Sequence, residues 1–442
     1  MNLNDIAKLL DTSCAGNPLI TGICIDSRQV KPGNLFIALR GERFDGHDFM
    51  AEVAAKGAVA IVCSEINNEI TIPQLKVPDT LQALAKIATA HRQTINCPII
   101  ALTGSNGKTS VKEMIATILP KPAHATPGNL NNHIGAPLTV LQLNPSHRYA
   151  VFELGANHVG EIAYTAAIVQ PQVALINNIA PAHIGEFGSI DGVARTKGEI
   201  YQALPQGGTA VINEDDSYAH FWDGSLTGKK VLRFSLNKPV DVYSKNIEFN
   251  EQGCAQFELV LPSGHGQVTL QVPGEHTVSN ALAAASCCHA AGISLADIIQ
   301  GLNQFRGVPG RMTFLQGKNQ CLVIDDTYNA NLRSVLTAVS VLAKRQGRRI
   351  LVLGDMGELG GWTQEHHEEI GYAAQRQGID VLMTCGTHSA HTSKAFGDSA
   401  KHYSNQEELA QDLLNKLDAN TTVLVKGSRS AAMEKIVHHL VG

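Results

Sequence analysis

The stretch IIALTGSNGKTSVKEM, residues 99–114, decides the fold of this chain. It reads as an apolar strand, then a glycine loop that ends in Gly107, Lys108 and Thr109, then a helix. Such a strand, loop and helix form a phosphate-binding loop, or P-loop, because backbone N–H groups and the helix dipole favour an anion. We therefore expect the N–H groups of residues 105–109 to point into one concavity around a phosphate.

This P-loop is shorter than the common one, which narrows the class of protein. Only Ser105 and Asn106 separate Gly104 from Gly107, whereas the common pattern has four residues there. Lys108 should contact the β- and γ-phosphates, and the hydroxyl of the threonine that follows it should bind Mg²⁺. A regulatory GTPase is disfavoured, because we find neither DxxG nor NKxD after the loop.

The chain divides into three blocks that differ in their pattern of predicted strands and helices. Residues 1–96 mix short strands and helices, residues 97–309 alternate strand and helix around the P-loop, and residues 310–442 alternate again. This alternation predicts α/β domains with largely parallel sheets, the last of them doubly wound. Short β-rich runs with Gly and Pro turns between 231 and 272 predict a small antiparallel annex on the central domain. FRGVPGRM, residues 305–312, is the expected hinge.

Composition excludes several classes of protein. A net charge of -5 argues against a protein that binds nucleic acid by neutralising its phosphates. No run of about 18 apolar residues is present, so we expect no transmembrane helix. The nine cysteines are scattered without a CxxC pair, and the N-terminus does not resemble a signal peptide. We expect reduced thiols and a cytoplasmic protein.

Three further residues lie where a P-loop protein handles metal and phosphate. Glu153 ends the buried strand of YAVFELG, which favours Mg²⁺ binding over a helix-capping or structural role. His183 follows another strand, in NNIAPAHIGEFGS, and is open between a metal ligand and a structural histidine. Lys197 lies on a predicted helix, and local sequence alone favours a solvated side chain.

The third block repeats the pattern of polar strand ends. Asp325 and Asp326 end its first strand, and LVLGDMGELG (351–360) and LVKGSRS (424–430) end later ones. Because ligands collect at the carboxyl ends of parallel strands, these tips predict one crevice. HEEIG (367–371) lacks the HExxH zinc pattern, so we expect a solvated helix face there.

These motifs together resemble the Mur ligases, which join amino acids to the nucleotide-linked precursor of bacterial peptidoglycan. The resemblance covers nearly the whole chain, in the order found in the family. It rests on TGSNGKTS, ELGANHVGEI, AHIGEFGS, TKGEI, HTVSNALAAA, PGRM, DDTYNAN, LGDMGELG and VKGSRS. GERFDGHDF, GNLNNHIGAPLTVL and DDTYNAN are most similar to the member that adds D-alanyl-D-alanine.

The resemblance implies an architecture and a reaction. It implies a mixed α/β UDP-substrate domain (1–96), an ATP-binding P-loop domain (97–309) and a C-terminal Rossmann-like domain (310–442). It implies ATP-dependent ligation of D-alanyl-D-alanine to UDP-N-acetylmuramoyl-tripeptide through an acyl phosphate. It also implies two Mg²⁺ ions, one of them held through a carbamylated lysine. We expect a monomer that binds no nucleic acid and inserts into no membrane.

The resemblance assigns roles by position, with Lys108, Lys197 and His183 expected to be catalytic. The metal ligands it implies are Thr109, Glu153, His183 and the carbamate of Lys197, which replaces the solvated role expected locally. The ATP-binding residues it implies are Gly104, Ser105, Asn106, Gly107, Lys108, Thr109, Ser110, Asn280, Arg311 and Asp326. The substrate-binding residues it implies are Ser27, Arg28, Asp45, Gly46, His47, Asn131 and Asn132.

Some residues depart from the family pattern. Thr277, Leu332 and Gly357 replace the asparagine, proline and leucine usual in the family, the first of them at a nucleotide-base contact.

Three rival functions remain to be compared with this one. Folylpolyglutamate synthetase lacks the first domain, which SRQVKPGNLFIALRGERFDGHDF indicates here. Sister ligases that add the third residue differ at YNAN. A nucleotide-dependent regulator without ligation is disfavoured by the missing GTPase motifs.

Overall fold

The computed structural model of the chain describes residues 2–14, 16–41, 44–180, 187–357 and 359–441. The chain divides into two compact units. The first contains Met1–Cys97, Thr126–Arg148 and Tyr164–Gln170, and the second contains Pro98–Ala125, Tyr149–Ala163 and Pro171–Gly442. The three domain boundaries expected from the sequence stay a prediction. No helix in the described ranges is long and apolar enough to cross a membrane.

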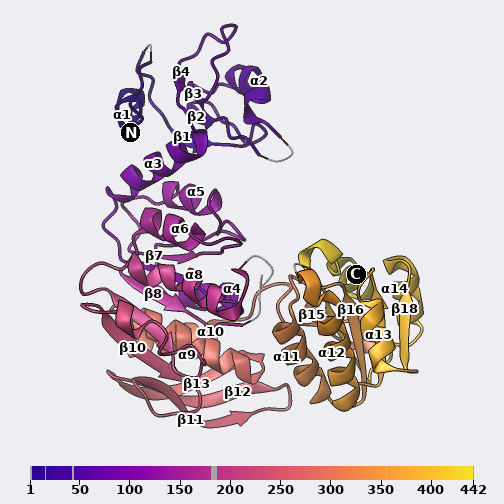
Figure 1. Cartoon of the computed structure of the whole chain (residues 1–442). Coiled ribbons are helices and arrows are strands. Elements are labelled where there is room, and N and C mark those ends of the chain that lie inside the picture. Colours follow the sequence, from indigo (N-terminus) through magenta and orange to yellow (C-terminus); the bar gives the residue numbers. More distant parts are fainter. Residues whose placement is uncertain (1, 15, 42–43, 181–186, 358, 442) are drawn as a thin grey trace. The chain divides into compact units, whose positions relative to one another are not determined.

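The first unit is built on a four-stranded parallel sheet (Figure 1). Its strands, in spatial order, are β1 (Gly22–Cys24), β2 (Asn34–Ile37), β3 (Ala60–Cys63) and β4 (Gln74–Lys76). Its helical elements include α1 (Leu3–Leu9), η1 (Gly46–Phe49), α2 (Met50–Ala55), α3 (Thr80–Arg92) and α5 (Gly135–Leu141). The expected cap is present, because Asp79 accepts the N–H groups of Leu81 and Gln82 at the start of α3.

The second unit begins with a nine-stranded sheet, ordered β13-β12-β11-β10-β9-β8-β5-β7-β6. Neighbours from β6 to β11 are parallel, and β11, β12 and β13 are antiparallel. The strands are β5 (Ile99–Thr103), β6 (Ala123–Ala125), β7 (Tyr149–Glu153), β8 (Val173–Ile176), β9 (Thr209–Asn213), β10 (Lys230–Ser235), β11 (Val242–Phe249), β12 (Cys254–Leu261) and β13 (Gly264–Pro273). The predicted antiparallel annex is therefore confirmed, as a continuation of the same sheet (Figure 1).

Helices pack against this sheet and bury an apolar core. They are α4 (Lys108–Ile118), α8 (Ile190–Gln202), α9 (Glu275–Ala290) and α10 (Leu295–Gln304), while α6 (Glu161–Val169) belongs partly to each unit. Fully buried residues of α4 and α9, such as Met114 and Leu282, share one core with the strands. A short helix, η2 (Asp223–Ser225), lies between β9 and β10.

The chain ends in a six-stranded sheet, ordered β14-β15-β19-β16-β17-β18, in which only β14 and β15 pair antiparallel. Its strands are β14 (Thr313–Gln316), β15 (Leu322–Asp326), β16 (Arg348–Gly354), β17 (Val381–Cys385), β18 (Ala400–Tyr403) and β19 (Thr421–Lys426). The helices and 3-10 turns are η3 (Lys318–Gln320), α11 (Leu332–Ala343), η4 (Gly360–Trp362), α12 (Thr363–Arg376), α13 (Ala390–Phe396), α14 (Gln406–Leu414), η5 (Arg429–Ala431) and α15 (Glu434–Val441). Two separate cores confirm helices on both faces.

The strand order decides which residues surround the P-loop. β5 lies between β7 and β8, with Leu102 beside Glu153 and Thr103 beside Ile176. Because all three strands are parallel, the segments that follow them leave the sheet at one edge. The residues after Thr103 therefore have the end of β7 on one side and the end of β8 on the other.

Candidate functional site

The P-loop has the strand, glycine loop and helix that its sequence predicts. β5 ends at Thr103, and α4 begins at Lys108 with Gly107 as its N-terminal cap residue. Gly107 is left-handed, with φ of 79°, and a Cβ there would lie 2.6 Å from Asn177 Nδ2 and 2.7 Å from Asn280 Oδ1. Only glycine fits, because both the backbone conformation and the space forbid a side chain. The predicted ATP residue Asn280 therefore lies against the loop.

The segment after β8 holds the first half of the P-loop. Asn178 accepts the Ser105 N–H at its carbonyl oxygen (2.9 Å) and the Asn106 N–H at Oδ1 (2.8 Å). Ser105 Oγ also exchanges hydrogen bonds with the backbone of Ala180. Our expectation that all N–H groups of residues 105–109 face a phosphate is therefore wrong for two of them.

The N–H groups that remain for a phosphate lie at the start of α4. A helix leaves its first N–H groups without intrahelical partners, and in α4 these belong to the first turn, residues 108–110. Ser110, a predicted ATP residue, is the third residue of that turn and is half-buried. The loop thus offers a phosphate the N-terminus of α4, while its first half is fixed to β8.

A second asparagine connects the P-loop to α9. Asn177 Nδ2 donates to the Asn106 carbonyl oxygen (2.9 Å) and to Asn280 Oδ1 (3.1 Å). The carbonyl oxygen of Asn177 in turn accepts a hydrogen bond from Asn213 Nδ2 at 2.9 Å. Strand end, loop and helix are therefore joined by a chain of amide groups, which keeps the loop rigid before any ligand binds.

Two lysines of the site have lowered pKa values. Lys108 Nζ donates to the Gly104 carbonyl oxygen at 2.7 Å. Burial lowers the pKa of the Lys108 amine, while the carboxylate of Glu153 opposes the decrease. Lys197, on α8, is 3% exposed, and its burial, with a further effect of the charge on Lys108, lowers its pKa well below the ordinary value. The sequence-based expectation of a solvated Lys197 is wrong.

The predicted metal ligands are described only in part. Glu153 is buried at the end of β7, and Thr109 is buried in the first turn of α4. His183 lies outside the described residues. Among the residues that the structure does describe, no group of three or more His, Cys, Asp or Glu side chains could hold a metal. The donors present are a carboxylate and a hydroxyl, which suit Mg²⁺ when nucleotide phosphates complete its shell.

Arg311 lies beside the same hydroxyl. Its Nη2 donates to Thr109 Oγ1 at 2.8 Å, and its guanidinium carbon lies 4.0 Å from the centroid of the Tyr328 ring. A hydroxyl has two lone pairs, so Thr109 can accept from Arg311 and still bind a cation. Arg311 is therefore anchored on both sides, by a hydroxyl and by an aromatic face.

Asp326, the other predicted ATP residue of the third block, ends β15 in a buried ion pair. Its Oδ2 lies 2.6 Å from Lys426 Nζ, and its Oδ1 accepts the Met312 N–H at 3.2 Å. Lys426 also donates to the Asn329 carbonyl oxygen at 2.8 Å. Burial lowers the pKa of His276, with Asp326 opposing and Lys426 adding to the decrease, so all three groups share one environment.

The predicted substrate residues lie in the first unit. Arg28 is exposed and pairs with Asp26 through two hydrogen bonds. Asp45 accepts the backbone N–H of His47 at 3.0 Å and lies 2.6 Å from its Nδ1, while His47 Nε2 accepts the Ser64 N–H at 2.9 Å. Both ring nitrogens of His47 are therefore engaged, which suits a supporting role.

The remaining substrate residues take part in local structure as well. The carbonyl oxygen of Ser27 accepts a hydrogen bond from Lys56 Nζ. A Cβ on Gly46 would lie 2.8 Å from backbone atoms of Leu39, so no side chain fits. Asn132 Oδ1 accepts the Gly135 N–H at the start of α5, and Asn131 precedes it in the same turn.

Four residues of the site were not named from the sequence. They are Asn177, Asn178, Tyr328 and Lys426. NNI after a strand and LVKG at a strand end were visible signals, since polar residues there face ligands. Their partners depend on which strands are neighbours, and local sequence does not contain that information.

Comparison with family patterns places the whole chain in one group of proteins. The Mur ligase family, catalytic domain matches residues 19–92, and the Mur ligase middle domain matches residues 102–288. The Mur ligase, glutamate ligase domain matches residues 310–429. These three matches follow one another along the chain without overlap.

Individual proteins are similar over their full length. The UDP-N-acetylmuramoyl-tripeptide--D-alanyl-D-alanine ligase of Escherichia coli (strain K12) is 43% identical, and the match covers 100% of this chain and 98% of that protein. A crystal structure of MurF from Acinetobacter baumannii is 37% identical with a TM-score of 0.92, covering 98% of this chain and 97% of that one. MurF ligase from Thermotoga maritima in complex with ADP is 27% identical with a TM-score of 0.84, covering 95% and 96%.

Proposed function

The chain belongs to the Mur ligase family, and from this premise we propose that its P-loop, Glu153 and Lys197 serve one ligation reaction. The enzyme joins D-alanyl-D-alanine to UDP-N-acetylmuramoyl-tripeptide at the expense of ATP, a step in the synthesis of the peptidoglycan precursor. The strongest support for these site roles is the burial of Lys197, which is 3% exposed and has a pKa lowered by burial and by the charge on Lys108, because a neutral amine can form the carbamate whereas a solvated, protonated one cannot.

Amide formation requires an activated acid, because a carboxylate does not react with an amine at neutral pH. A terminal carboxylate oxygen of the tripeptide attacks the γ-phosphorus of ATP, the bond to ADP breaks, and an acyl phosphate forms. The amine of D-alanyl-D-alanine then attacks the acyl carbon and loses a proton, and inorganic phosphate leaves. Lys108 and the N-terminus of α4 offset the repulsion between the two anions.

Mg²⁺ fits the oxygen donors of this site. Thr109, Glu153 and His183 would hold it together with the phosphates of ATP, and a second ion would use the carbamate of Lys197. When bound, Mg²⁺ supplies positive charge that stabilises the transferring phosphoryl group. Arg311 supplies further positive charge beside Thr109.

Carbamylation of Lys197 requires a neutral amine. The nitrogen attacks the carbon of CO₂ and releases a proton, and the product is an anion with two oxygen donors. A solvated lysine is protonated at neutral pH and does not react, whereas burial lowers the pKa of Lys197 and favours the neutral form. The lysine would thereby be converted from a cation into a ligand for a cation.

The other predicted site residues are assigned to one of the two bound substrates. We assign Asn280 and Asp326 to ATP, and Ser27, Arg28, the Asp45–His47 turn, Asn131 and Asn132 to the UDP-linked substrate. We expect a monomer in the cytoplasm that uses no nucleic acid. All nine cysteines are free thiols.

ADP release with each substrate omitted in turn tests this proposal. We expect rapid release only when UDP-N-acetylmuramoyl-tripeptide and D-alanyl-D-alanine are both present, and its loss in Lys108→Ala with the fold intact. A panel of UDP-muramoyl peptides and amine acceptors identifies the preferred pair. Release that does not depend on the amine acceptor would contradict ligation.

A further inference from the structure

A segment between β9 and β10 has no role in the reaction described so far. It comprises residues 214–226, EDDSYAHFWDGSL, and we call it the brace. It contains Trp222, which is 7% exposed, and the half-exposed Phe221. Because the brace contacts the helix that carries Lys197, its role rests on the function proposed above.

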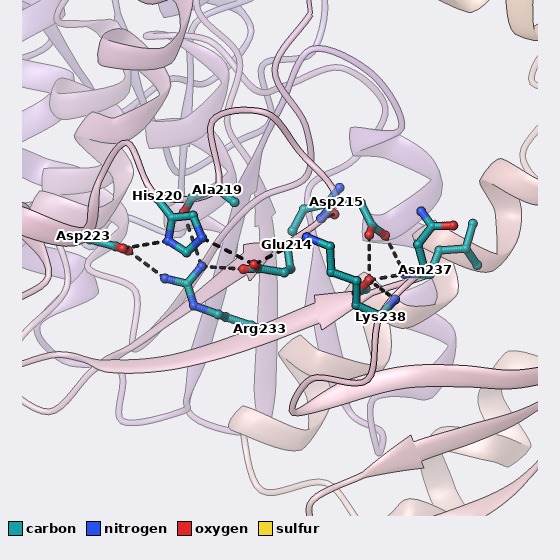
Figure 2. Close-up of polar contacts among 11 residues, drawn as sticks. Glu214, Asp215, Ala219, His220, Asp223, Arg233, Asn237 and Lys238 are labelled. Carbon is teal, nitrogen blue, oxygen red and sulfur yellow. Dashed lines mark hydrogen bonds and ion pairs between the residues drawn. The ribbon is translucent and has the colours of Figure 1, made fainter.

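Arg233 of β10 fastens the brace at two points. Its Nη1 lies 2.8 Å from Glu214 Oε2 and its Nη2 lies 2.7 Å from Asp223 Oδ1, so one guanidinium joins the beginning of the brace to its end (Figure 2). Arg233 is mostly buried, which strengthens such a fork compared with a fully solvated ion pair. Glu214 and Asp223 are thereby kept together although nine positions separate them.

His220 and Asp215 add to this fastening. The two ring nitrogens of His220 face the same carboxylates, with Nδ1 2.9 Å from Asp223 and Nε2 3.4 Å from Glu214 (Figure 2). Asp215 accepts the Ser235 hydroxyl and the Leu236 N–H, both at 2.6 Å. The brace is therefore held to β10 and the turn after it by charged groups along its length.

The brace reaches the P-loop side of the site through Asp216. Its Oδ2 accepts the Ile179 N–H at 2.8 Å, one residue after Asn178. Asn213, the last residue of β9, directly precedes the brace and donates to the Asn177 carbonyl oxygen at 2.9 Å. The strand end that fixes the P-loop is thus itself fixed from the brace and from the end of β9.

The brace also contacts α8, in the part of the helix that contains Lys197. Trp222 Nε1 donates to the Ala194 carbonyl oxygen at 3.1 Å. A Cβ on Gly198 would lie 2.4 Å from the same Nε1, so the indole fills the place of a side chain on the helix. The Trp222 ring also packs edge-on against Tyr201, with centroids 5.6 Å apart.

These contacts lie on the same face of α8 as Lys197. Residues 194, 197, 198 and 201 are spaced by three and four along the helix, so they form one stripe, and all four are buried. Tyr201 further fixes that stripe to the sheet, because its hydroxyl donates to the Val211 carbonyl oxygen at 2.7 Å. Trp222 is therefore the side chain of the brace that packs against this stripe of α8.

Tyr218 adds a contact at the N-terminal end of α8. Its hydroxyl donates to Asp191 Oδ1 at 2.5 Å, in the first turn of the helix. The hydrogen bond to this carboxylate raises the pKa of Tyr218 above its ordinary value. The brace thus contacts α8 in its first turn and again in its middle.

We propose that Trp222 is a positioning residue for ligation, because its indole fixes the turn of α8 that carries Lys197 while Arg233 fixes the brace to β10. Metal ligands act only in a narrow range of positions, and an error of about 1 Å in a reacting geometry can cost about 100-fold in rate. Trp222 itself touches no reacting atom. Its replacement should reduce kcat and leave the KM for ATP nearly unchanged, because the P-loop remains intact.

Trp222→Phe with Trp362→Phe as the matched control tests this inference. The change removes the indole N–H and part of the ring in both variants, and Trp362 is half-exposed and far from α8 along the chain. We expect kcat to fall about 10- to 100-fold in the first variant and to stay at the wild-type value in the second. Thermal melting checks that both variants fold.

The reactivity and carbamylation of Lys197 distinguish a positioning role of Trp222 from a merely structural one. In enzyme without substrate, an amine-reactive reagent followed by peptide mass spectrometry gives the labelling rate of Lys197, and ¹³C-labelled bicarbonate reports its carbamate. We expect Trp222→Phe to change the labelling rate several-fold and to raise the bicarbonate concentration needed for half-maximal activity. Trp362→Phe should match the wild type in both measurements.

Arg233→Gln is a second variant, which loosens the brace without changing a residue that contacts α8. Arg349→Gln is its control, because Arg349 also pairs with a carboxylate, that of Asp380. We expect Arg233→Gln to alter Lys197 labelling in the same direction as Trp222→Phe. If both brace variants fold and retain wild-type kcat and labelling, the inference is overturned. If the wild type forms no carbamate, the proposed role of Lys197 fails, while altered labelling and kcat in the variants would still support positioning.

Discussion

Asn178 and Asn106 are joined by a reciprocal pair of hydrogen bonds. Asn178 Oδ1 accepts the Asn106 N–H at 2.8 Å, and Asn178 Nδ2 donates to the Asn106 carbonyl oxygen at 3.0 Å. The side chain of one residue thus satisfies both backbone groups of the other, as a neighbouring strand would. This pair explains how a loop with only two residues between its glycines keeps a fixed shape.

Asn178→Ala should weaken ATP binding. The variant leaves the Asn106 N–H without its partner, at a cost of about 1–3 kcal/mol, while the Asn106 carbonyl oxygen keeps only its bond from Asn177, and ATP must then order a loosened loop. We expect the dissociation constant of ATP, measured by calorimetry, to rise about 5- to 150-fold. Asn250→Ala is the control, because Asn250 also caps a backbone N–H, that of Cys254, in an exposed turn. Equal affinity in both variants would refute the role of Asn178.

Gly107→Ala should be far more harmful than Gly207→Ala. Both glycines have a similar positive φ, 79° and 76°, but only at Gly107 would a Cβ meet neighbouring atoms within 4 Å. Positive φ costs an alanine about 1 kcal/mol at either site, so the difference between the variants isolates crowding by Asn177 and Asn280. We expect Gly107→Ala alone to abolish ATP binding, as followed by calorimetry. Comparable binding in the two variants would contradict the crowding.

Thr109→Val should lose affinity for Mg·ATP, and Thr109→Ser should keep most of it. Valine has the shape of threonine without the hydroxyl that Arg311 contacts at 2.8 Å. A hydrogen bond to a charged group contributes about 1.5–3 kcal/mol, so we expect about 10-fold weaker binding or more. Titration of the nucleotide with and without Mg²⁺ separates the metal from the arginine. A serine variant as weak as the valine variant would show that shape, not the hydroxyl, matters.

Lys197 should make the stability of the substrate-free enzyme depend on pH. Its pKa is lowered in the folded state, so the unfolded chain, with a value of about 10.4, binds that proton more strongly. The free energy of unfolding must therefore rise with pH until about pH 10.4, by about 1.4 kcal/mol for each unit of the shift. In Lys197→Met this contribution is absent, and the protein should be more stable at pH 7.

Urea denaturation at pH 7 and pH 9.5 in CO₂-free buffer measures this dependence. We expect the wild type to gain stability relative to Lys197→Met as the pH is raised, because protonation no longer opposes folding. Lys230→Met is the control, since Lys230 is exposed, and it should follow the wild type. Parallel pH profiles for the wild type and Lys197→Met would rule out a buried neutral lysine.

Lys197→Ala should be inactive and partly rescued by a short carboxylic acid. Acetate or formate can enter the space left by the lysine and supply the two oxygens that the carbamate provides. Steady-state ligation with increasing acid measures the rescue, with Lys230→Ala as the control that needs none. Inactivity without rescue at any acid concentration would favour the plain amine as the working group.

The sequence predicted the P-loop well because its information is local. A strand, a glycine with positive φ and a helix N-terminus adjoin in the chain, so Gly107 and Lys108 could be assigned from spacing alone. The antiparallel strands β11 to β13 were likewise visible in their turns and alternation. Features of this kind need no knowledge of the fold.

The sequence predicted less where the partner comes from a distant segment. Asn178 acts on the P-loop only because β8 lies beside β5, and Trp222 reaches α8 only because Gly198 leaves space for it. His367 was expected on a solvated face, but it is fully buried, with Nε2 accepting the Met356 N–H. Helix α12 packs against α13, which that short motif could not predict. The role of His183 stays a prediction.

The path of one oxygen atom tests the proposed reaction most directly. UDP-N-acetylmuramoyl-tripeptide labelled with ¹⁸O in its terminal carboxylate is ligated to D-alanyl-D-alanine with unlabelled ATP, and the released phosphate is analysed by mass spectrometry. Because the carboxylate attacks the γ-phosphorus, we expect one labelled oxygen in each phosphate. Phosphate without label, released in step with the amide product, would contradict the acyl phosphate and with it the assigned role of the P-loop.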